Sequence, residues 1–195
     1  MAPDVLARGP RVVLRGWTAP DRAALREWLR PEHEWHRWEA PYYPAPSDLE
    51  AEAIADGAGR APGVGLPPGR AVLDVGGRLV GTVSWYWESV ETHWARMGIT
   101  VFDPAERGHG VGREALGLWT SYLFGATDWV RLDLATWSGN GAMLAVARAL
   151  GFVEEGRFRR ARVVDGERYD AVVMGVLREE WEELSRGDER GKEPA

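Results

Sequence analysis

The chain contains no cysteine among its 195 residues. This absence excludes disulfide bonds, cysteine-ligated metal sites and any acyl-enzyme formed on a thiol of the chain. No apolar run approaches the ~20 residues that a membrane span needs. The N-terminal sequence MAPDVLARGPR lacks the basic-then-apolar pattern of a signal peptide. We therefore expect a soluble, cytoplasmic protein without a membrane partner.

Positive charge is also in short supply. The 24 Lys and Arg residues are outnumbered by 30 Asp and Glu residues, which gives a formal net charge of −6. Nucleic acid is a poor candidate partner, because phosphate binding requires a basic surface. Long-range steering by an acidic protein favours cations such as amines.

The composition fits one folded domain of ordinary size. Hydrophobic residues make up 45% of the chain and aromatic residues 10%, which is typical of a globular protein with a core. We find no internal repeat and no linker. The prediction is a single domain over residues 1–185, followed by a disordered tail over 186–195.

Strand and helix patterns alternate along the chain. Hydrophobic periodicity predicts helices over 19–30, from Ser47 onward, up to about residue 124, over 139–152 and over 178–185. Ser47, with Glu50 three residues on, predicts a capping box at the start of the second helix. Strands are predicted over 11–17, 70–75, 78–87, 93–104, 130–137, 156–164 and 168–177. The strands that end near 102 and begin at 130 flank a helix, so a right-handed crossover makes them parallel neighbours. The fold class is therefore mixed α/β (α+β), with a mostly antiparallel seven-stranded sheet flanked by helices.

A glycine-rich stretch, RGHGVGREAL at 107–116, follows the fourth predicted strand and opens a helix. A helix N-terminus presents free N–H groups and a positive dipole end, and glycine lets a phosphate approach the backbone. Neither a dinucleotide fingerprint nor a P-loop fits. The first needs glycine or alanine at 113, where Arg113 stands, and the second needs Gly-Lys-Ser/Thr at 113–115.

The pattern that does fit is Arg-x-x-Gly-x-Gly, formed by Arg107, Gly110 and Gly112. It resembles the pyrophosphate loop of the GNAT superfamily of N-acetyltransferases, which bind acetyl-CoA. The segments GITVFDPAERGHGVGREAL, TWSGNGAMLAVARALGF and GRFRRARVVDGERYDAVVMGVLREEW resemble the strand–loop–helix, Asn–helix–Gly-Phe and closing hairpin of its RimJ/RimL-like branch. Together they cover residues 93 to 181, in the family's order and spacing.

The resemblance implies a set of coenzyme A contacts. The fourth and fifth strands are expected to be parallel and to splay, so that the pantetheine arm lies between them as a pseudo-strand. A backbone N–H near Val101 or Phe102 would hold the thioester carbonyl. The implied cofactor-binding residues are Thr100, Val101, Phe102, Arg107, Gly108, His109, Gly110, Val111, Gly112, Arg113 and Asn140. An N-cap is the alternative role for Asn140, and the two roles are compatible.

The resemblance also implies direct transfer of the acetyl group to an amine in a ternary complex, and the absence of cysteine agrees with this. An aromatic segment is expected to wall the acceptor pocket or to form a dimer contact; it contains Trp35, Trp38, Tyr42 and Tyr43. A homodimer is a further expectation from the resemblance alone. We expect no metal, because the HEWH histidines lack helical ligand spacing.

The catalytic acid and base do not carry over from the family. Ala147 stands where many relatives have a tyrosine, and Arg96 stands where this branch often has glutamate. Asp133 is a candidate base if it is half-buried, and an exposed edge carboxylate is the alternative. Ser138 is a candidate proton donor to the leaving thiolate, or it shapes the turn.

The sequence therefore predicts an acetyl-CoA-dependent N-acetyltransferase acting on a protein N-terminus, a polyamine or another small amine. A catalytically silent sensor of acyl-CoA is the alternative, favoured by Ala147 and Arg96. A phosphate-binding interaction protein without acyl chemistry is a third and weaker reading.

Overall fold

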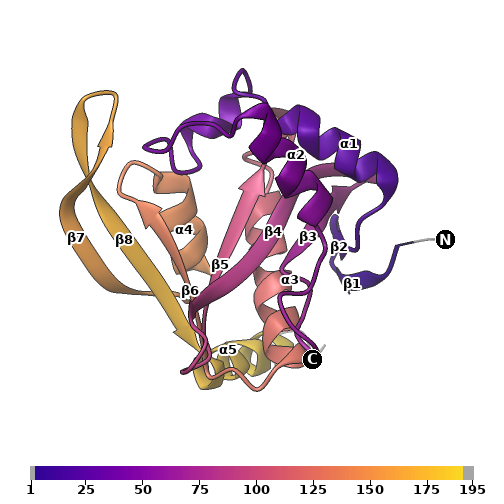
Figure 1. The fold of residues 1–195 in the computed structure, drawn as a ribbon. Coiled ribbons are helices and arrows are strands. Elements are labelled where there is room, and N and C mark those ends of the chain that lie inside the picture. The colour runs from indigo at the N-terminus through magenta and orange to yellow at the C-terminus, as the bar shows by residue number, and fades with distance from the viewer. Residues whose placement is uncertain (1–2, 191–195) are drawn as a thin grey trace.

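A computed structural model describes residues 3–190 of the chain. Its centre is one sheet of eight strands in the order β1-β2-β3-β4-β5-β6-β8-β7, with helices on both faces (Figure 1). The strands are β1 (Val5–Arg8), β2 (Val12–Arg15), β3 (Arg70–Val75), β4 (Arg78–Ser89), β5 (Trp94–Val101), β6 (Arg131–Trp137), β7 (Val153–Val164) and β8 (Glu167–Leu177). The predicted mixed fold is confirmed. β1 is an eighth strand that the sequence patterns did not reveal.

Five α-helices and two short 3-10 helices make up the remaining regular structure of residues 3–190. They are α1 (Ala19–Trp28), η1 (Glu34–Arg37), α2 (Asp48–Gly57), η2 (Pro104–Glu106), α3 (Val111–Ala126), α4 (Gly141–Ala149) and α5 (Arg178–Arg190). The capping box predicted at Ser47 is present: its hydroxyl accepts from the Glu50 N–H, and the Glu50 carboxylate accepts from the Ser47 N–H. None of the helices in the described part of the chain is long and apolar enough to cross a membrane.

Two tight turns close the predicted hairpins. Gly76 and Gly77 join β3 to β4 with φ angles of 61° and 82°, and Asp165 and Gly166 join β7 to β8 with 50° and 82°. Positive φ at both central residues matches the strand twist, which explains why glycine marks these turns in the sequence.

α5 runs to Arg190, beyond Ser185, where we expected the chain to become disordered. Its helical span is thus longer than predicted. Residues 191–195 of the predicted tail lie outside the described residues.

β5 and β6 are parallel, as predicted, and they are joined by α3. Their pairing covers three residues on each strand, Ala95–Met97 against Leu132–Leu134. β5 continues to Val101 and β6 to Trp137 without further pairing between them. The sheet therefore opens beyond Met97, along the last four residues of β5, and η2 then leads to the glycine loop.

The sheet separates two cores. On one face, α3 and α4 pack against β-strand residues around the fully buried Trp119. On the other face, α1, η1 and α2 pack around Leu25, Trp35 and Phe102. Because successive strand residues point to opposite faces, Val101 joins the first core and Phe102 the second. The end of β5 is therefore held from both sides.

Candidate active site

The glycine loop joins η2 to α3 and leaves its backbone donors free. Gly108 and Gly110 have φ angles of 75° and 83°, and no atom lies within 4 Å of where a Cβ would stand on either residue. Gly110 is the N-cap of α3 and offers no side chain to the first turn. Within residues 3–190, none of the N–H groups of residues 108–113 donates a hydrogen bond. These donors lie at the N-terminus of α3, where the helix dipole is positive, which suits an anion.

Arg107 fixes this loop to the end of β5. Its Nε donates to the Val101 carbonyl at 3.2 Å, and its Nη2 donates to the Phe102 carbonyl at 3.2 Å. A third nitrogen lies 3.7 Å from Glu34. The guanidinium of Arg107 thus braces the loop, and the contact with the cofactor that the resemblance implied stays a prediction.

Arg11, which the sequence analysis overlooked, supports the loop from the other side. Its Nη1 donates to the His109 carbonyl at 2.6 Å. Glu114 in the first turn of α3 accepts from the N–H groups of Arg11 and Val12, both at 2.9 Å. No local signal links Arg11 to residues a hundred positions away. Arg113 is exposed on the same turn and makes no ion pair with the described residues.

The edge of β5 that faces β6 is open beyond Met97. The Phe102 N–H donates to the Val80 carbonyl at 2.8 Å, so Phe102 is not a free donor as expected. Hydrogen-bonding directions alternate along a strand. The N–H groups of Ile99 and Val101 therefore point away from β4, toward the space that β6 has left. Of Val101 and Phe102, it is therefore Val101 whose N–H can donate to the carbonyl of a ligand between β5 and β6.

A pocket of 530 Å³ lies on the sheet face that carries the Thr100 side chain. β4 and β5 supply its floor, and the segments around α1, η1 and α2 supply its walls. The lining residues are Leu29, Trp35, Glu39, Pro44, Ala45, Pro46, Glu50, Ala53, Ile54, Arg70, Thr82, Ser84, Gly98, Thr100 and Phe102. Of the four predicted wall residues, Trp35 lines this pocket, and Trp38, Tyr42 and Tyr43 do not.

These three aromatic residues lie outside the pocket lining. Trp38 and Tyr43 are 46% and 63% exposed, and the Tyr42 ring packs under the Arg162 guanidinium at 4.3 Å. The Trp38 carbonyl accepts two hydrogen bonds, from Trp137 Nε1 at 3.1 Å and from Asn140 Nδ2 at 3.2 Å. The backbone of the segment is therefore tied to the end of β6 and the start of α4.

Glu39 follows this tied carbonyl and reaches the pocket. Glu39 is exposed to solvent where it lines the pocket, but desolvation by the protein atoms around its carboxylate raises its pKa from an ordinary 4.5 to about 7. The Thr100 hydroxyl and the Arg70 charge act in the opposite direction. Burial in turn lowers the pKa of Arg70. Sequence reasoning missed Glu39, because nothing local distinguishes it from its neighbours Glu32 and Glu34.

Asp133 is fully buried in an ion-pair cluster. It accepts from Arg96 Nε at 2.6 Å and Arg96 Nη2 at 3.1 Å, and from Trp94 Nε1 at 2.6 Å. Arg131 lies 3.5 Å away. Neither expected environment, half-buried or exposed at an edge, is correct, since Asp133 is 0% exposed. With both oxygens occupied, this carboxylate is poorly suited to take a proton from a substrate.

Ser138 and Asn140 cap the carboxyl end of β6. The Ser138 hydroxyl accepts from the Asp170 N–H at 2.9 Å, which continues the pairing of β6 with β8. Asn140 Oδ1 accepts from the Met143 N–H at 3.1 Å, so Asn140 is the N-cap of α4. A role of either residue toward cofactor or substrate stays a prediction.

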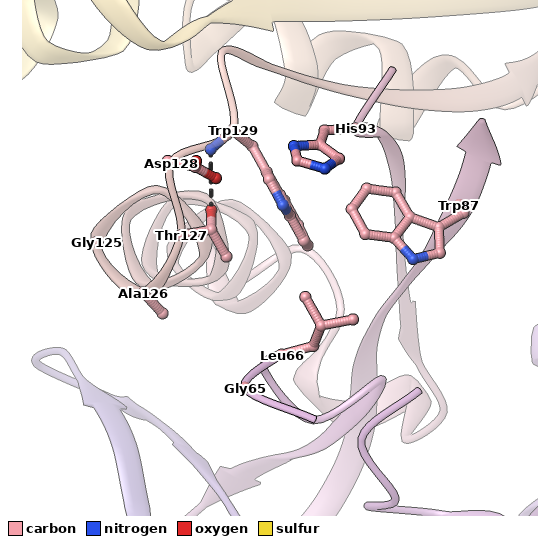
Figure 2. Close-up of a pocket in the computed structure, with 9 residues that line it drawn as sticks. All are labelled: Gly65, Leu66, Trp87, His93, Gly125, Ala126, Thr127, Asp128 and Trp129. Carbon is pink, nitrogen blue, oxygen red and sulfur yellow. Dashed lines mark hydrogen bonds between the residues drawn. The ribbon is translucent and has the colours of Figure 1, made fainter. Parts of the chain in front are cut away.

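A second cavity, of 480 Å³, lies near the start of β5 (Figure 2). Trp87, His93 and Trp129 form its aromatic walls, with the Trp87 and Trp129 rings 4.8 Å apart. Leu66, in the loop between α2 and β3, closes one side. None of the residues predicted from the sequence lines this cavity.

The comparisons with known proteins agree with the fold. Residues 11–153 match the family model described as an acetyltransferase (GNAT) domain. The chain belongs to this family of acetyltransferases.

Among relatives, the SPbeta prophage-derived uncharacterized N-acetyltransferase YokL of Bacillus subtilis is 29% identical over 84 residues, which are 43% of this chain and 47% of YokL. The chain spans about half the length of the curated relatives it matches.

Solved structures share the fold. The ribosomal L7/L12 α-N-protein acetyltransferase RimL, in complex with coenzyme A, aligns with a TM-score of 0.74 and 18% identity over 89% of this chain and 98% of RimL. The spermidine N-acetyltransferase of Vibrio cholerae, in complex with coenzyme A and spermine, aligns with a TM-score of 0.71 and 19% identity over 89% of this chain and 99% of that one. At these identities the likeness defines the fold alone.

Proposed function

We propose that this chain is an acetyl-CoA-dependent N-acetyltransferase that moves an acetyl group directly to a primary amine. One observation carries the proposal: the six N–H groups of residues 108–113 are free, and they follow the strand, β5, whose end is no longer paired with β6. An anion cradle beside an open strand edge matches a ligand with a pyrophosphate and an amide-bearing arm. The family membership and the two coenzyme A complexes with this fold support the same ligand.

The residues present fit coenzyme A. Gly108 and Gly110 leave space that any side chain would fill, so a pyrophosphate can reach the backbone. The N–H groups of Ile99 and Val101 are placed to pair with the pantetheine amides and the thioester carbonyl. When bound, acetyl-CoA supplies the activated acetyl group. The chain's part is to hold the ligand's phosphates, align its arm along β5 and admit the amine from the 530 Å³ pocket.

The acceptor is an amine-bearing peptide or small molecule. RimL acts on a protein N-terminus and the Vibrio cholerae enzyme on spermidine, and both classes present an ammonium group. The pocket joins apolar walls to the carboxylates of Glu39 and Glu50, which suits a cation carried on an apolar chain.

The test is release of free thiol from acetyl-CoA across a panel of peptide N-termini, polyamines and small amines. The protein contributes no thiol background, because the chain has no cysteine. Gly110→Trp should abolish turnover. Gly166→Trp is the matched control: its φ of 82° is close to the 83° of Gly110 and its surroundings are equally open, but it lies in the β7–β8 turn. Tight binding of acetyl-CoA without turnover for any acceptor would instead favour the silent sensor.

A further inference from the structure

Glu39 differs in its contacts from the other carboxylates on the sheet face that carries the pocket. Asp133 is saturated by its donors. Glu88 is paired with Arg96 at 2.6 Å, and Glu50 accepts from the backbone and hydroxyl of Ser47. Glu39 makes no ion pair with the described residues, although Arg70 lines the same pocket. Its carboxylate therefore has the Thr100 hydroxyl as a neighbour but no cation paired to it, and it can still accept from a ligand.

The position of Glu39 matches the expected reacting centre. Its carboxylate lies beside the Thr100 hydroxyl, and Thr100 lies between Ile99 and Val101, whose N–H groups face the opening in the sheet. Gly98 and Ser84 line the pocket next to it without bulky side chains. An amine that enters from the pocket would thus meet the carboxylate and the β5 edge together.

The backbone before Glu39 is held in place. Trp137 and Asn140 both donate to the Trp38 carbonyl, and the Glu39 N–H donates to the Trp35 carbonyl at 3.2 Å. A general base must be within hydrogen-bond reach of its proton, so such fixation favours a chemical role.

We propose that Glu39 is the general base that accepts the proton of the acceptor amine, and this inference rests on the proposed function. The nitrogen forms a bond to the thioester carbonyl carbon, and the carbon–sulfur bond then breaks. The ammonium nitrogen first loses one proton to Glu39, which passes it to water. After the nitrogen has attacked, it loses a second proton to Glu39, and Glu39 gives this proton to the leaving thiolate. The acceptor enters as an ammonium ion, and Trp137 and Asn140 are positioning residues.

The local charges set the pH at which Glu39 acts. Three neighbouring elements face it: β3 contributes Arg70, α2 contributes Glu50 and β5 contributes Thr100, while Tyr42 lies on its own segment. Burial outweighs Arg70 and Thr100 and places the pKa of Glu39 at about 7. The base form is lost as the pH falls, so kcat/KM should decline tenfold per pH unit below this value.

The experiment compares wild type, Glu39→Gln and Glu32→Gln by thiol release from pH 5.5 to 9 and by calorimetric binding of acetyl-CoA. Glu32 is a carboxylate on the same segment that does not line the pocket. Glu39→Gln should lower kcat/KM by about 100-fold or more, remove the decline below pH 7 and leave the Kd for acetyl-CoA unchanged. Glu32→Gln should match wild type in all three measurements.

A second measurement is independent of turnover. Carbon-detected NMR titration of the Glu39 carboxyl group in the free protein should give a midpoint near 7. A midpoint near 4.5, or a Glu39→Gln variant that retains the wild-type rate and pH profile, overturns the assignment while leaving the acetyltransferase proposal intact. If wild type neither binds nor turns over acetyl-CoA, the proposed function itself fails, and the assignment of Glu39 fails with it.

A third variant tests the positioning residues. Trp137→Phe keeps an aromatic ring but removes the Nε1–H that holds the Trp38 carbonyl. A looser segment admits water to Glu39 and lowers the pKa of its carboxyl group. The decline in kcat/KM should therefore move to lower pH, with the Kd for acetyl-CoA unchanged. An unmoved pH profile would contradict this part of the inference.

Discussion

Replacing Asp133 by asparagine should destabilise the protein without removing its chemistry. The carboxylate is fully buried and holds Arg96, whose side chain is only 14% exposed. Asparagine has the same shape, but it is neutral and turns an N–H₂ group toward the guanidinium or the Trp94 indole. Breaking a buried ion pair in this way costs ~3–5 kcal/mol. We expect a loss of ~3 kcal/mol, because Arg96 keeps Glu88 as a second partner.

The assay is urea unfolding followed by tryptophan fluorescence, for which the chain offers eleven tryptophans. A loss of this size should lower the Tm by roughly 6–12 °C in a protein of this length. Glu155→Gln is the control. Glu155 pairs with Arg131 at the surface, where both side chains are about one-third exposed, so the expected loss is under ~1 kcal/mol.

Activity measured well below the Tm completes the test of Asp133. A structural role predicts that folded Asp133→Asn retains most of the wild-type kcat. An unfolding free energy within ~1 kcal/mol of wild type, together with a kcat lowered ~100-fold, would refute this reasoning and restore Asp133 as a catalytic carboxylate.

Three further predictions concern stability and cofactor affinity. Burial raises the pKa of Asp21, but hydrogen bonds from Arg15 and Thr18 outweigh it, so the pKa lies below 3.8. The unfolding free energy should therefore fall as the pH drops below this value. Asp21→Asn should flatten that pH dependence in acid unfolding curves. Arg107→Lys removes both bonds to the end of β5 and should raise the KM for acetyl-CoA about tenfold; an unchanged KM would contradict its role as a brace. Ser47→Ala should cost ~1 kcal/mol in urea unfolding by removing the α2 cap; no change would show that the cap is dispensable.

The features that the sequence predicted well are local. Gly110 and Gly166 mark positions of positive φ, which glycine adopts readily, and the Ser47 capping box spans only four residues. The parallel β5–β6 pair follows from a single strand–helix–strand crossover. The sequence pattern predicted the glycine loop because its backbone donors lie on six consecutive residues, 108–113.

The features that the sequence missed depend on distant contacts. Asp133 meets Trp94 across 39 positions, and this pairing decides that its carboxylate is saturated. Trp137 meets the Trp38 carbonyl across 99 positions, which places Glu39 in the pocket. Arg107 fits the family motif, but its guanidinium turns back to the strand that precedes it. Side-chain partners of this kind are set by tertiary packing, which residue spacing does not encode.

The most direct test of the loop as a coenzyme A cradle is an NMR titration of ¹⁵N-labelled protein with acetyl-CoA. We predict that the amide signals of residues 108–113 shift most strongly, and that those of Ile99 and Val101 move with the same saturation curve. Unmoved signals at these residues would contradict the account, and shifts confined to the cavity around Trp87, His93 and Trp129 would place the ligand there instead.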